Sequence, residues 1–539
     1  MVRFLIPILM AQSQFDQLDF LNSFVAELPG EETADARPRQ VPGVCYSRVQ
    51  PTAVREPRLL AWSDALAATL GVARPPAAGR AVDALAGNLV TATMQPFAAR
   101  YGGHQFGSWA GQLGDGRAMS LGEVLAPDGR RWEIQLKGAG PTPYSRRADG
   151  RAVLRSSVRE FLCSEAMHAL GVPTTRALSL VSTGDAVVRD MFYDGNAQPE
   201  PGAIVARVAP TFVRFGNFQL LTATGETDNL RTLADYVIRH HHPELGAPSA
   251  EGYRQWFAEV CRRTAVMVAH WMTVGFVHGV MNTDNMSILG LTIDYGPYGW
   301  LEPYEPGWTP NTTDFSQHRY AFGQQPQVAL WNLAQLGRAL TPLVSDVAGL
   351  NEALNTYRDT FLTTQHELLR RKLGLSTGQA ADAALLADLP QGLTASEMDM
   401  TVFFRRLSHL VPVLWEPAQE EAAFEELVES ASYLPEPGPV HAALRTWLGR
   451  YAARLRQETA GVEAIRAGML AANPKYVLRN YLAQQATEAA EAGDLTLLET
   501  LLAVLQKPFD EHPAHEALAA RRPEWARDKP GAATLSCSS

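Results

Sequence analysis

A polar turn in the middle of the chain carries side chains that phosphoryl and nucleotidyl transfer require. The run 277–289 contains the pair Asp284 and Asn285 between apolar residues, and Asp294, Tyr295 and Gly296 follow shortly after it. Such reactions need a carboxylate near the attacking hydroxyl. They also need an amide oxygen and a second carboxylate to hold a divalent metal on the phosphates. The run supplies this set of groups.

Upstream elements add the other parts of a kinase-like nucleotide site. The stretch 101–122 is glycine-rich, Lys137 ends the alternating run 131–136 that predicts a strand, and Glu160 lies in a helix predicted over 152–170. Each part has an ordinary interpretation, because Asp-Asn pairs are common in turns and a lysine after a strand is usually solvated. Glu160 taken alone is better explained as a solvated helix carboxylate. The order of the parts along the chain indicates the nucleotide site.

Bulk properties exclude several classes of protein. The 539 residues are enough for more than one lobe, and the composition, 46% hydrophobic and 19% charged, is that of a globular protein. The net charge of -10, from 47 basic and 57 acidic residues, argues against nonspecific nucleic-acid binding. The apolar run 4–9 contains Pro7 and is too short for a membrane span or a clear signal peptide. We therefore expect a cytoplasmic protein with no membrane or nucleic-acid partner.

The four cysteines have neither a disulfide framework nor metal-ligand spacing. Cys163 and Cys261 lie in apolar helical runs, which predicts buried free thiols. Cys537, near the end of the chain, is predicted to be exposed and mobile and is a redox candidate. The tract 240–242 of three histidines precedes a proline at a predicted helix end, and we interpret it as a solvated loop rather than a metal site.

Apolar periodicity outlines the remaining elements. Helical segments are expected at 57–85, which is rich in alanine, at 257–276 and repeatedly from residue 328 onward. Residues 30–42 and the Ala/Gly-rich stretch 374–396 are expected to be a loop and a connector, and the last thirty or so residues to be extended.

The two short apolar runs after the Asp-Asn pair suggest a further local structure. Residues 286–289 and 291–293 could form a hairpin around Gly290. Such a hairpin would return Asp294 to the neighbourhood of Asp284.

At these motifs the chain resembles the selenoprotein O family, protein adenylyltransferases with a protein-kinase-like fold. The matching segments are Tyr101–Gly107, Gln135–Arg146, His278–Asn285, Asp294–Pro297, Asn473–Asn480 and the terminal Cys537–Ser539, which resembles an end where some members carry selenocysteine. The similarity covers nearly the whole chain. It implies an α+β, protein-kinase-like two-lobe fold. The expected parts are an N-terminal extension (1–90), an N-lobe (91–206), a C-lobe with the catalytic and metal loops (207–370), and a large helical C-terminal region and tail (371–539).

The resemblance also implies residue roles. ATP would lie reversed relative to ordinary kinases, so that its α-phosphate faces the acceptor hydroxyl. Asp284 is then the base, and Asn285 and Asp294 hold Mg²⁺, a hard cation suited to their oxygens. Lys137 would contact phosphate and pair with Glu160. The residues expected to bind or support the nucleotide are Gly114, Gly116, Arg117, Lys137, Asp149, Gly150, Glu160, Arg207, Arg214 and Asp294.

One departure concerns redox control. Some members have a cysteine after the Asp-Tyr-Gly that can pair with the terminal cysteine, whereas residues 305–314 of this chain contain none. An internal disulfide of that kind is therefore not expected, and Cys537 would pair with Cys45, act on another protein's thiol or do nothing.

The function predicted is AMPylation: Mg²⁺-dependent transfer of AMP from ATP to Ser, Thr or Tyr hydroxyls of protein substrates by a monomer, with Mn²⁺ as the other candidate metal. The same residues would serve a protein kinase or a UMP transferase using UTP. A nucleotide-binding scaffold without turnover is the alternative from another class. The intact set of Lys137, Asp284, Asn285 and Asp294 argues against it.

Overall fold

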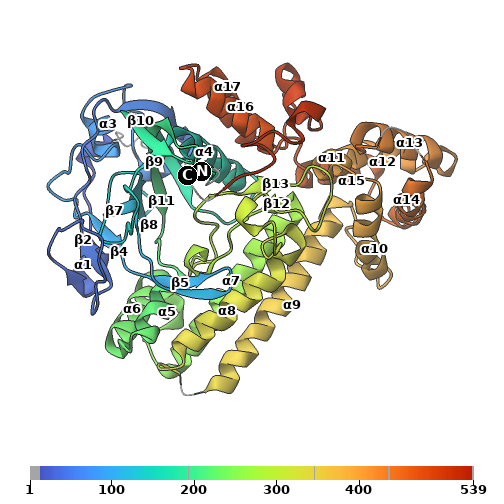
Figure 1. The fold of residues 1–539 in the computed structure, drawn as a ribbon. Coiled ribbons are helices and arrows are strands. Elements are labelled where there is room, and N and C mark those ends of the chain that lie inside the picture. Colours follow the sequence, from blue (N-terminus) through green and yellow to red (C-terminus); the bar gives the residue numbers. More distant parts are fainter. Residues whose placement is uncertain (1–12, 192–193, 345, 435–437, 537–539) are drawn as a thin grey trace, which may run out of the picture.

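The computed structural model describes residues 13–191, 194–344, 346–434 and 438–536 and has a mixed α+β architecture. In Figure 1 a sheet and its covering helices form one side of the molecule, long helices form the lower part, and an array of C-terminal helices projects to the right. The α+β class expected from the sequence is confirmed.

Nine of the described strands form one mixed sheet in the order β1-β2-β4-β7-β8-β11-β10-β3, with β9 paired to β11. Only β1 and β2 run parallel to each other, and the other pairs are antiparallel. Two further pairs, β5-β6 and β12-β13, stand outside this sheet. The strands are β1 Gly30–Glu31, β2 Tyr46–Arg48, β3 Arg58–Trp62, β4 Phe97–Ala99, β5 Gly102–Gln105, β6 Ser108–Gln112, β7 Ala118–Leu125, β8 Arg131–Lys137, β9 Ala152–Val153, β10 Arg176–Arg189, β11 Gln198–Ala209, β12 Phe276–Val277 and β13 Gly299–Trp300.

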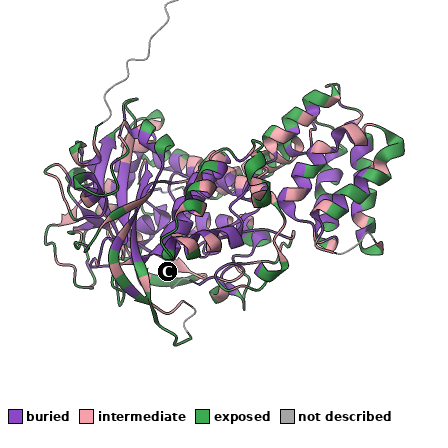
Figure 2. Cartoon of the chain, turned by 90° about the horizontal axis from the view of Figure 1, so that it is seen from above, coloured by how far each residue is buried: buried purple, intermediate pink, exposed green. Residues whose placement is uncertain are grey.

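The large sheet is buried on both faces. Successive strand residues point to opposite faces. Accordingly, Ile204 and Ala206 pack in a core with side chains from residues 15–98, whereas Val205, between them, packs in a core with α4. This double burial explains the apolar run 203–206 of β11, whereas β8 alternates, with Trp132, Ile134 and Leu136 between polar residues. Figure 2 shows the buried residues concentrated through this part of the molecule.

Helices make up most of the second half of the chain. They are α1 Ser23–Glu27, α2 Asp64–Leu70, α3 Arg80–Leu85, α4 Leu154–Ala169, α5 Phe215–Ala223, α6 Thr227–His241, α7 Ala250–Val274, α8 Gln325–Leu340, α9 Val347–Lys372, α10 Asp382–Ala395, α11 Met400–His409, α12 Val411–Leu414, α13 Glu420–Ala431, α14 Ala442–Leu455, α15 Val462–Ala472, α16 Asn480–Glu491 and α17 Thr496–Leu505. Helices α10 to α15 share a separate core, while α16 and α17 return to pack on α4. None of the helices described carries a stretch long and apolar enough to cross a bilayer.

The longest helix of the site region, α7, begins and ends at residues that favour these positions. The Ser249 side chain accepts a hydrogen bond from the backbone of Gly252, and Gly275 ends the helix in a left-handed conformation with φ of 78°. The helix predicted over 257–276 is thus confirmed, although it starts seven residues earlier at Ala250. It carries the chain into the segment that contains Asp284.

The segments 57–85 and 374–396 differ from the expectation. The stretch 57–85 opens with strand β3, because residues 58–62 pair with β10, and the helical part is divided into α2 and α3. The stretch 374–396 is mainly helix α10 rather than a connector. Its leucines at 385, 386, 389 and 393 are buried in the core of the projecting helices. Alanine favours helices, so alanine content was a poor sign of a connector.

The hairpin expected around Gly290 does not form. Ser287 makes an isolated bridge to Arg214 and Thr292 makes one to Thr174, so the two apolar runs pair with separate parts of the chain. Gly290, with φ of 65°, sits in a turn closed by a hydrogen bond from its nitrogen to the carbonyl of Ser287. Long-range pairing prevails here over the local pattern.

The C-terminal segment is docked rather than extended. Residues 513–519 and 524–526 form short 3₁₀ helices, and Leu535 is buried. The Leu535 nitrogen donates to the carbonyl of Pro310, and its carbonyl accepts from the Thr312 nitrogen at 2.8 Å. The prediction about Cys537 falls outside the described residues.

The buried thiols are confirmed, and the interpretation of the histidine tract was wrong. Cys163 and Cys261 are fully buried and free, and burial raises the pKa of each thiol. His241 is the last residue of α6, and His242 is fully buried rather than solvated. Burial lowers the pKa of His242 to about 4.

Candidate active site

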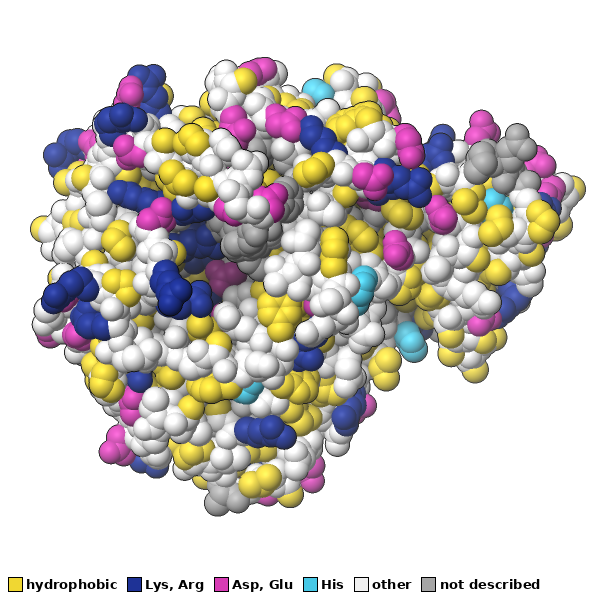
Figure 3. Space-filling model, viewed as in Figure 1, with side chains coloured by type: hydrophobic (Ala, Val, Ile, Leu, Met, Phe, Trp, Pro, Cys, Tyr) yellow, Lys and Arg dark blue, Asp and Glu magenta, His cyan; other side chains and the backbone are white. Residues whose placement is uncertain are grey.

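A deep cleft of about 720 Å³ lies where the large sheet meets the loops that follow α7. Its walls come from β8, β10, β11, the loop 113–117 and the segments 280–285 and 294–297. Figure 3 shows a hollow on this face of the molecule with blue Lys and Arg atoms around magenta Asp or Glu atoms. Although the chain carries a net charge of -10, six basic side chains line the cleft against four acidic ones. The cleft is therefore a local site for an anion.

Lys137 enters the cleft from the end of β8, where it lies between β7 and β11. Its Nζ is 2.5 Å from the Glu160 carboxylate on α4, and both side chains are almost wholly buried. Burial lowers the pKa of Lys137, and the Glu160 carboxylate partly offsets this effect. Glu160 is thus a buried partner of the lysine and not a solvated helix residue.

Asp294 joins two arginines that are distant from it in sequence. Arg207 on β11 donates to Asp294 Oδ1 at 2.6 Å, and Arg214, which precedes α5, donates to Asp294 Oδ2. Arg207 also lies 3.3 Å from the Glu160 carboxylate, so one charge network includes this pair and the Lys137 pair. Both guanidinium groups are buried.

The two guanidinium groups control the ionisation of Asp294. Burial by itself would raise the pKa of this carboxyl, but the charges of Arg214 and Arg207 outweigh it and hold the pKa well below its usual range. Asp294 also has a positive φ of 58°, a conformation that a residue with a side chain adopts at a cost of about 1–3 kcal/mol. The ion pairs hold the backbone in this strained position, with the carboxylate at the cleft.

Asp284 and Asn285 lie together in a short 3₁₀ turn, residues 283–285, at the same cleft. Asp284 Oδ2 accepts a hydrogen bond from Gln105 Nε2 at 3.2 Å, whereas the buried Oδ1 has no hydrogen-bond partner. Burial raises the pKa of Asp284 to about 6, and this group is therefore more basic than an ordinary aspartate while still ionised at neutral pH. The Asn285 amide nitrogen donates to the Val280 carbonyl at 2.9 Å, which leaves its amide oxygen as the group available to a cation.

The loop 113–117 forms another wall. Gly114 has φ of 87°, and a Cβ there would lie 2.4 Å from the Tyr144 ring. At Gly116 a Cβ would lie 2.7 Å from the Tyr144 carbonyl oxygen. Glycine is required at both positions, and the close approach keeps Arg117 at the cleft wall, where burial lowers the pKa of its guanidinium.

Asp149 and Gly150 flank the cleft but are not among the residues that line it. Asp149 is half-exposed and pairs with Arg189, a lining residue, at 2.7 Å. Gly150 packs against the backbone of Gly140, where a Cβ would clash at 2.1 Å. Glu160 and Arg214 stand behind the wall as partners of lining residues. The other predicted site residues, namely Gly114, Gly116, Arg117, Lys137, Arg207, Asp284, Asn285 and Asp294, all line the cleft.

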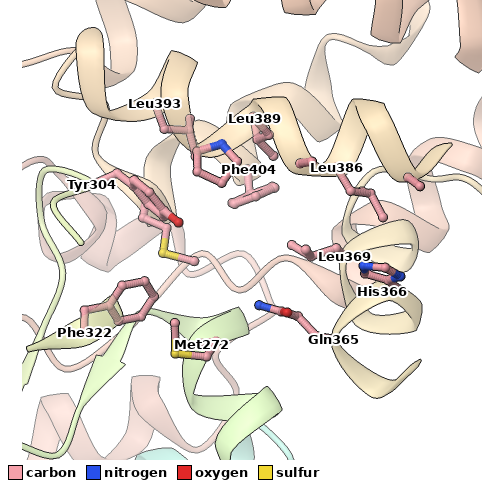
Figure 4. Close-up of a pocket in the computed structure, with 14 residues that line it drawn as sticks. Met272, Tyr304, Phe322, Gln365, His366, Leu369, Leu386, Leu389, Leu393 and Phe404 are labelled. Carbon is pink, nitrogen blue, oxygen red and sulfur yellow. The ribbon is translucent and has the colours of Figure 1, made fainter. Parts of the chain in front are cut away.

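A second cavity of about 230 Å³ has a different character. It lies between α7, α9, α10 and α11, and Figure 4 shows leucine, methionine and aromatic side chains pointing into it. Its lining contains no Asp, Glu, Lys or Arg. Because phosphate groups need cationic or N–H donors, this cavity does not suit a nucleotide, and the polar cleft is the candidate active site.

Comparison with known proteins agrees with this geometry. The model of the family described as "Protein adenylyltransferase SelO" matches residues 36–506. The chain belongs to this family. It is 56% identical to the protein nucleotidyltransferase YdiU of Nitrosospira multiformis over 557 residues, which cover 99% of this chain and 98% of that protein. It is also 56% identical to the protein of the same name from Xanthomonas campestris over 524 residues, 97% of this chain and 99% of that protein.

Membership of the SelO family confirms the resemblance found in the sequence and makes the chain an enzyme of the nucleotidyltransferase class. The residues at the cleft suit a divalent cation. The described residues contain no group of three His, Cys, Asp or Glu side chains that could hold a metal alone. Asn285 and Asp294 offer hard oxygen ligands, so a cation there would draw its other ligands from phosphate oxygens and water.

Sequence reasoning missed two polar residues of this candidate site. Gln105 contacts the Asp284 carboxylate, and the Asn282 side chain accepts hydrogen bonds from the Phe106 nitrogen and the Tyr320 hydroxyl. Both residues fall inside the matching segments 101–107 and 278–285, which were used only to recognise the family. No spacing rule connects residues so distant along the chain.

Proposed function

We propose that this protein transfers AMP from ATP to Ser, Thr or Tyr hydroxyls of other proteins. The acceptor oxygen forms a bond to the α-phosphorus of ATP. The bond from that phosphorus to the bridging oxygen breaks, pyrophosphate leaves, and the hydroxyl proton passes to a base. Family membership supports nucleotidyl transfer, and the relatives' printed name, protein nucleotidyltransferase, does not distinguish AMP from UMP.

The observation that carries the proposal is the charge network on the cleft wall. Arg207 and Arg214 meet at Asp294, and the Lys137–Glu160 pair joins them through Arg207. Such a cluster suits a polyphosphate, because guanidinium groups give rigid, permanently charged forks to phosphate oxygens. Asp294 and Glu160 hold the side chains of Lys137, Arg207 and Arg214 in place. A bound polyphosphate would share these three cationic groups with the two carboxylates.

Each residue of the chain then has a role. Asp284 accepts the proton of the acceptor hydroxyl, a role consistent with its pKa of about 6. Arg207, Arg214 and Lys137 bind phosphate oxygens and stabilise the charge that passes to pyrophosphate. Asn285 and Asp294 would hold Mg²⁺, or Mn²⁺ in its place, and the cation would neutralise charge on the phosphates.

The other predicted nucleotide ligands support this arrangement from the rim. Arg117, with Gly114 and Gly116, would cover the nucleotide from the loop 113–117. Asp149 and Gly150 would act through the segment 148–151, whose Ala148 and Arg151 line the cleft. We further propose that ATP lies with its α-phosphate toward Asp284.

The architecture is compatible with a protein-kinase-like pair of lobes. We propose an N-lobe at 91–206 that contains most of the large sheet and α4, and a C-lobe at 207–370 that contains the catalytic and metal loops. Residues 1–90 would be an N-terminal extension, and 371–539 a helical region and tail. The boundary between the two lobes would fall within β11, since residues 206 and 207 both belong to that strand.

Parallel labelling tests the proposal. The protein is incubated with β-casein, as a generic acceptor, and Mg²⁺ or Mn²⁺, with ATP labelled in the α position or in the γ position. Self-modification is scored in the same gel. We expect label on protein from α-labelled ATP and none from γ-labelled ATP. Label from the γ position alone would identify a kinase. A parallel incubation with labelled UTP distinguishes UMP transfer from AMP transfer.

A further inference from the structure

Strands β5 and β6 form a hairpin that stands outside the large sheet and lies against the loop carrying Asp284. Figure 1 shows β5 near α5, away from the other strands of the N-terminal half. Three consecutive residues of the hairpin contact three consecutive residues of the loop. His104 N donates to Thr283 Oγ1 at 2.7 Å, Gln105 Nε2 to Asp284 Oδ2 at 3.2 Å, and Phe106 N to Asn282 Oδ1 at 3.2 Å.

Glycines permit this close approach. A Cβ at Gly103 would lie 2.6 Å from Asp284 Oδ1, so any side chain there would push the carboxylate aside. Gly216 of α5 lies so close to the Gly102 carbonyl oxygen that a Cβ there would come within 2.1 Å of that oxygen, and within 3.5 Å of Asp284 Cα. The hairpin, α5 and the Asp284 loop thus pack against one another, and neither Gly103 nor Gly216 has room for a side chain.

The position of the Asp284 carboxylate depends on this hairpin. Arg214 holds the backbone of Asp284 by donating to its carbonyl oxygen at 2.9 Å, but this contact does not set the rotation of the side chain. The side-chain oxygen Oδ1 has no partner, and Oδ2 accepts from Gln105. Among the described side chains, Gln105 is the one that donates a hydrogen bond to this carboxylate.

We propose that Gln105 is a positioning residue, which orients the Asp284 carboxylate toward the acceptor hydroxyl, and that the β5–β6 hairpin is the element that delivers it. This inference rests on the proposed role of Asp284 as the base. Gln105 suits the task because its amide nitrogen donates to the carboxylate without adding a charge that would compete with the acceptor. It lies on β5 rather than on a flexible loop, so its position is set by the pairing with β6.

The variants Gln105→Ala and Gln105→Glu test the proposal. Glutamate keeps the shape of glutamine but presents an oxygen in place of the N–H donor. Ser108→Ala, at the exposed tip of the same hairpin, is the matched control that leaves the contact intact. For both Gln105 variants we expect kcat for AMP transfer to β-casein to fall by about ten- to a hundredfold, the usual effect of losing a hydrogen bond to a charged group. ATP affinity, measured by calorimetry, should stay within about twofold of the original protein.

A purely structural role would give a different pattern. If Gln105 only filled space, Gln105→Glu would retain activity while Gln105→Ala lost it. If Gln105 bound the nucleotide, ATP affinity would fall and kcat would not. Either result, or full activity in both variants, overturns the proposal.

If the original protein transfers no AMP, that result refutes the proposed function alone. Hydrogen exchange, measured without substrates, then still tests the positioning role of Gln105. Peptides covering 278–289 should exchange faster in both Gln105 variants than in the original protein and in Ser108→Ala. Equal exchange in all four proteins would overturn the positioning role. Matching melting temperatures of the variants confirm that each one is folded.

Discussion

Replacing Asp294 with asparagine removes the one carboxylate shared by two buried guanidinium groups. Its side chain is 22% exposed, whereas those of Arg207 and Arg214 are 3% and 2% exposed. Removal of one partner from a buried pair costs about 3–5 kcal/mol, because the remaining charge stays buried without compensation. Arg207 keeps its contact with Glu160 at 3.3 Å, so we expect a loss near the lower limit, about 3 kcal/mol.

Urea unfolding followed by tryptophan fluorescence measures this loss. Asp149→Asn is the matched control, since it breaks a half-exposed pair with Arg189, for which about 0–1 kcal/mol is expected. Pyrophosphate without metal should stabilise Asp294→Asn more than the original protein, because the anion replaces the missing carboxylate. Asp294→Ala should also abolish turnover. Equal stability of Asp294→Asn and Asp149→Asn, or no preference for pyrophosphate, would refute the electrostatic reasoning.

Three further predictions follow from other parts of the structure. Lys137→Met should weaken ATP binding by about ten- to a hundredfold in calorimetry, because it removes a charged donor at the cleft, and unchanged affinity would exclude Lys137 from the phosphate site. The free energy of unfolding should fall as the pH drops from about 6.5 to about 4, since His242 is protonated at a higher pH in the unfolded chain than in the folded protein. In urea titrations, His242→Gln should lose less stability over this pH range than the original protein. Leu535→Ala should speed proteolytic cleavage within 309–320, because it removes the buried side chain that anchors the tail, whose backbone bonds Pro310 and Thr312. An unchanged cleavage rate would show that the tail does not support this segment.

The sequence was most informative where local pattern and burial agree. Alternation predicted β8 and placed Lys137 at its end, and helical spacing predicted α4 with Glu160 on it. The local pattern failed at 286–293, because pairing with Thr174 and Arg214, far along the chain, decides the conformation there. Such long-range pairing has no signature in a short window of sequence.

The candidate site also contains residues that the local sequence pattern identifies and residues that it does not. Asp284 and Asn285 were recognisable because they are adjacent in a polar turn. Arg207 and Arg214 became candidates only through the family resemblance, since they meet Asp294 across 87 and 80 residues of chain. Gln105 was missed because its contact with Asp284 spans 179 residues. Periodicity identifies which face of an element is buried, but not which distant side chain that face meets.

The mass added to an acceptor protein tests the central claim most directly. Proteins from cells that express the active chain are compared, by mass spectrometry of their peptides, with those from cells that express Asp294→Ala. The account predicts peptides that carry an adenylyl group on Ser, Thr or Tyr in the first sample and none in the second. Peptides that carry only an added phosphoryl group, or adenylyl groups equally abundant in both samples, would contradict it.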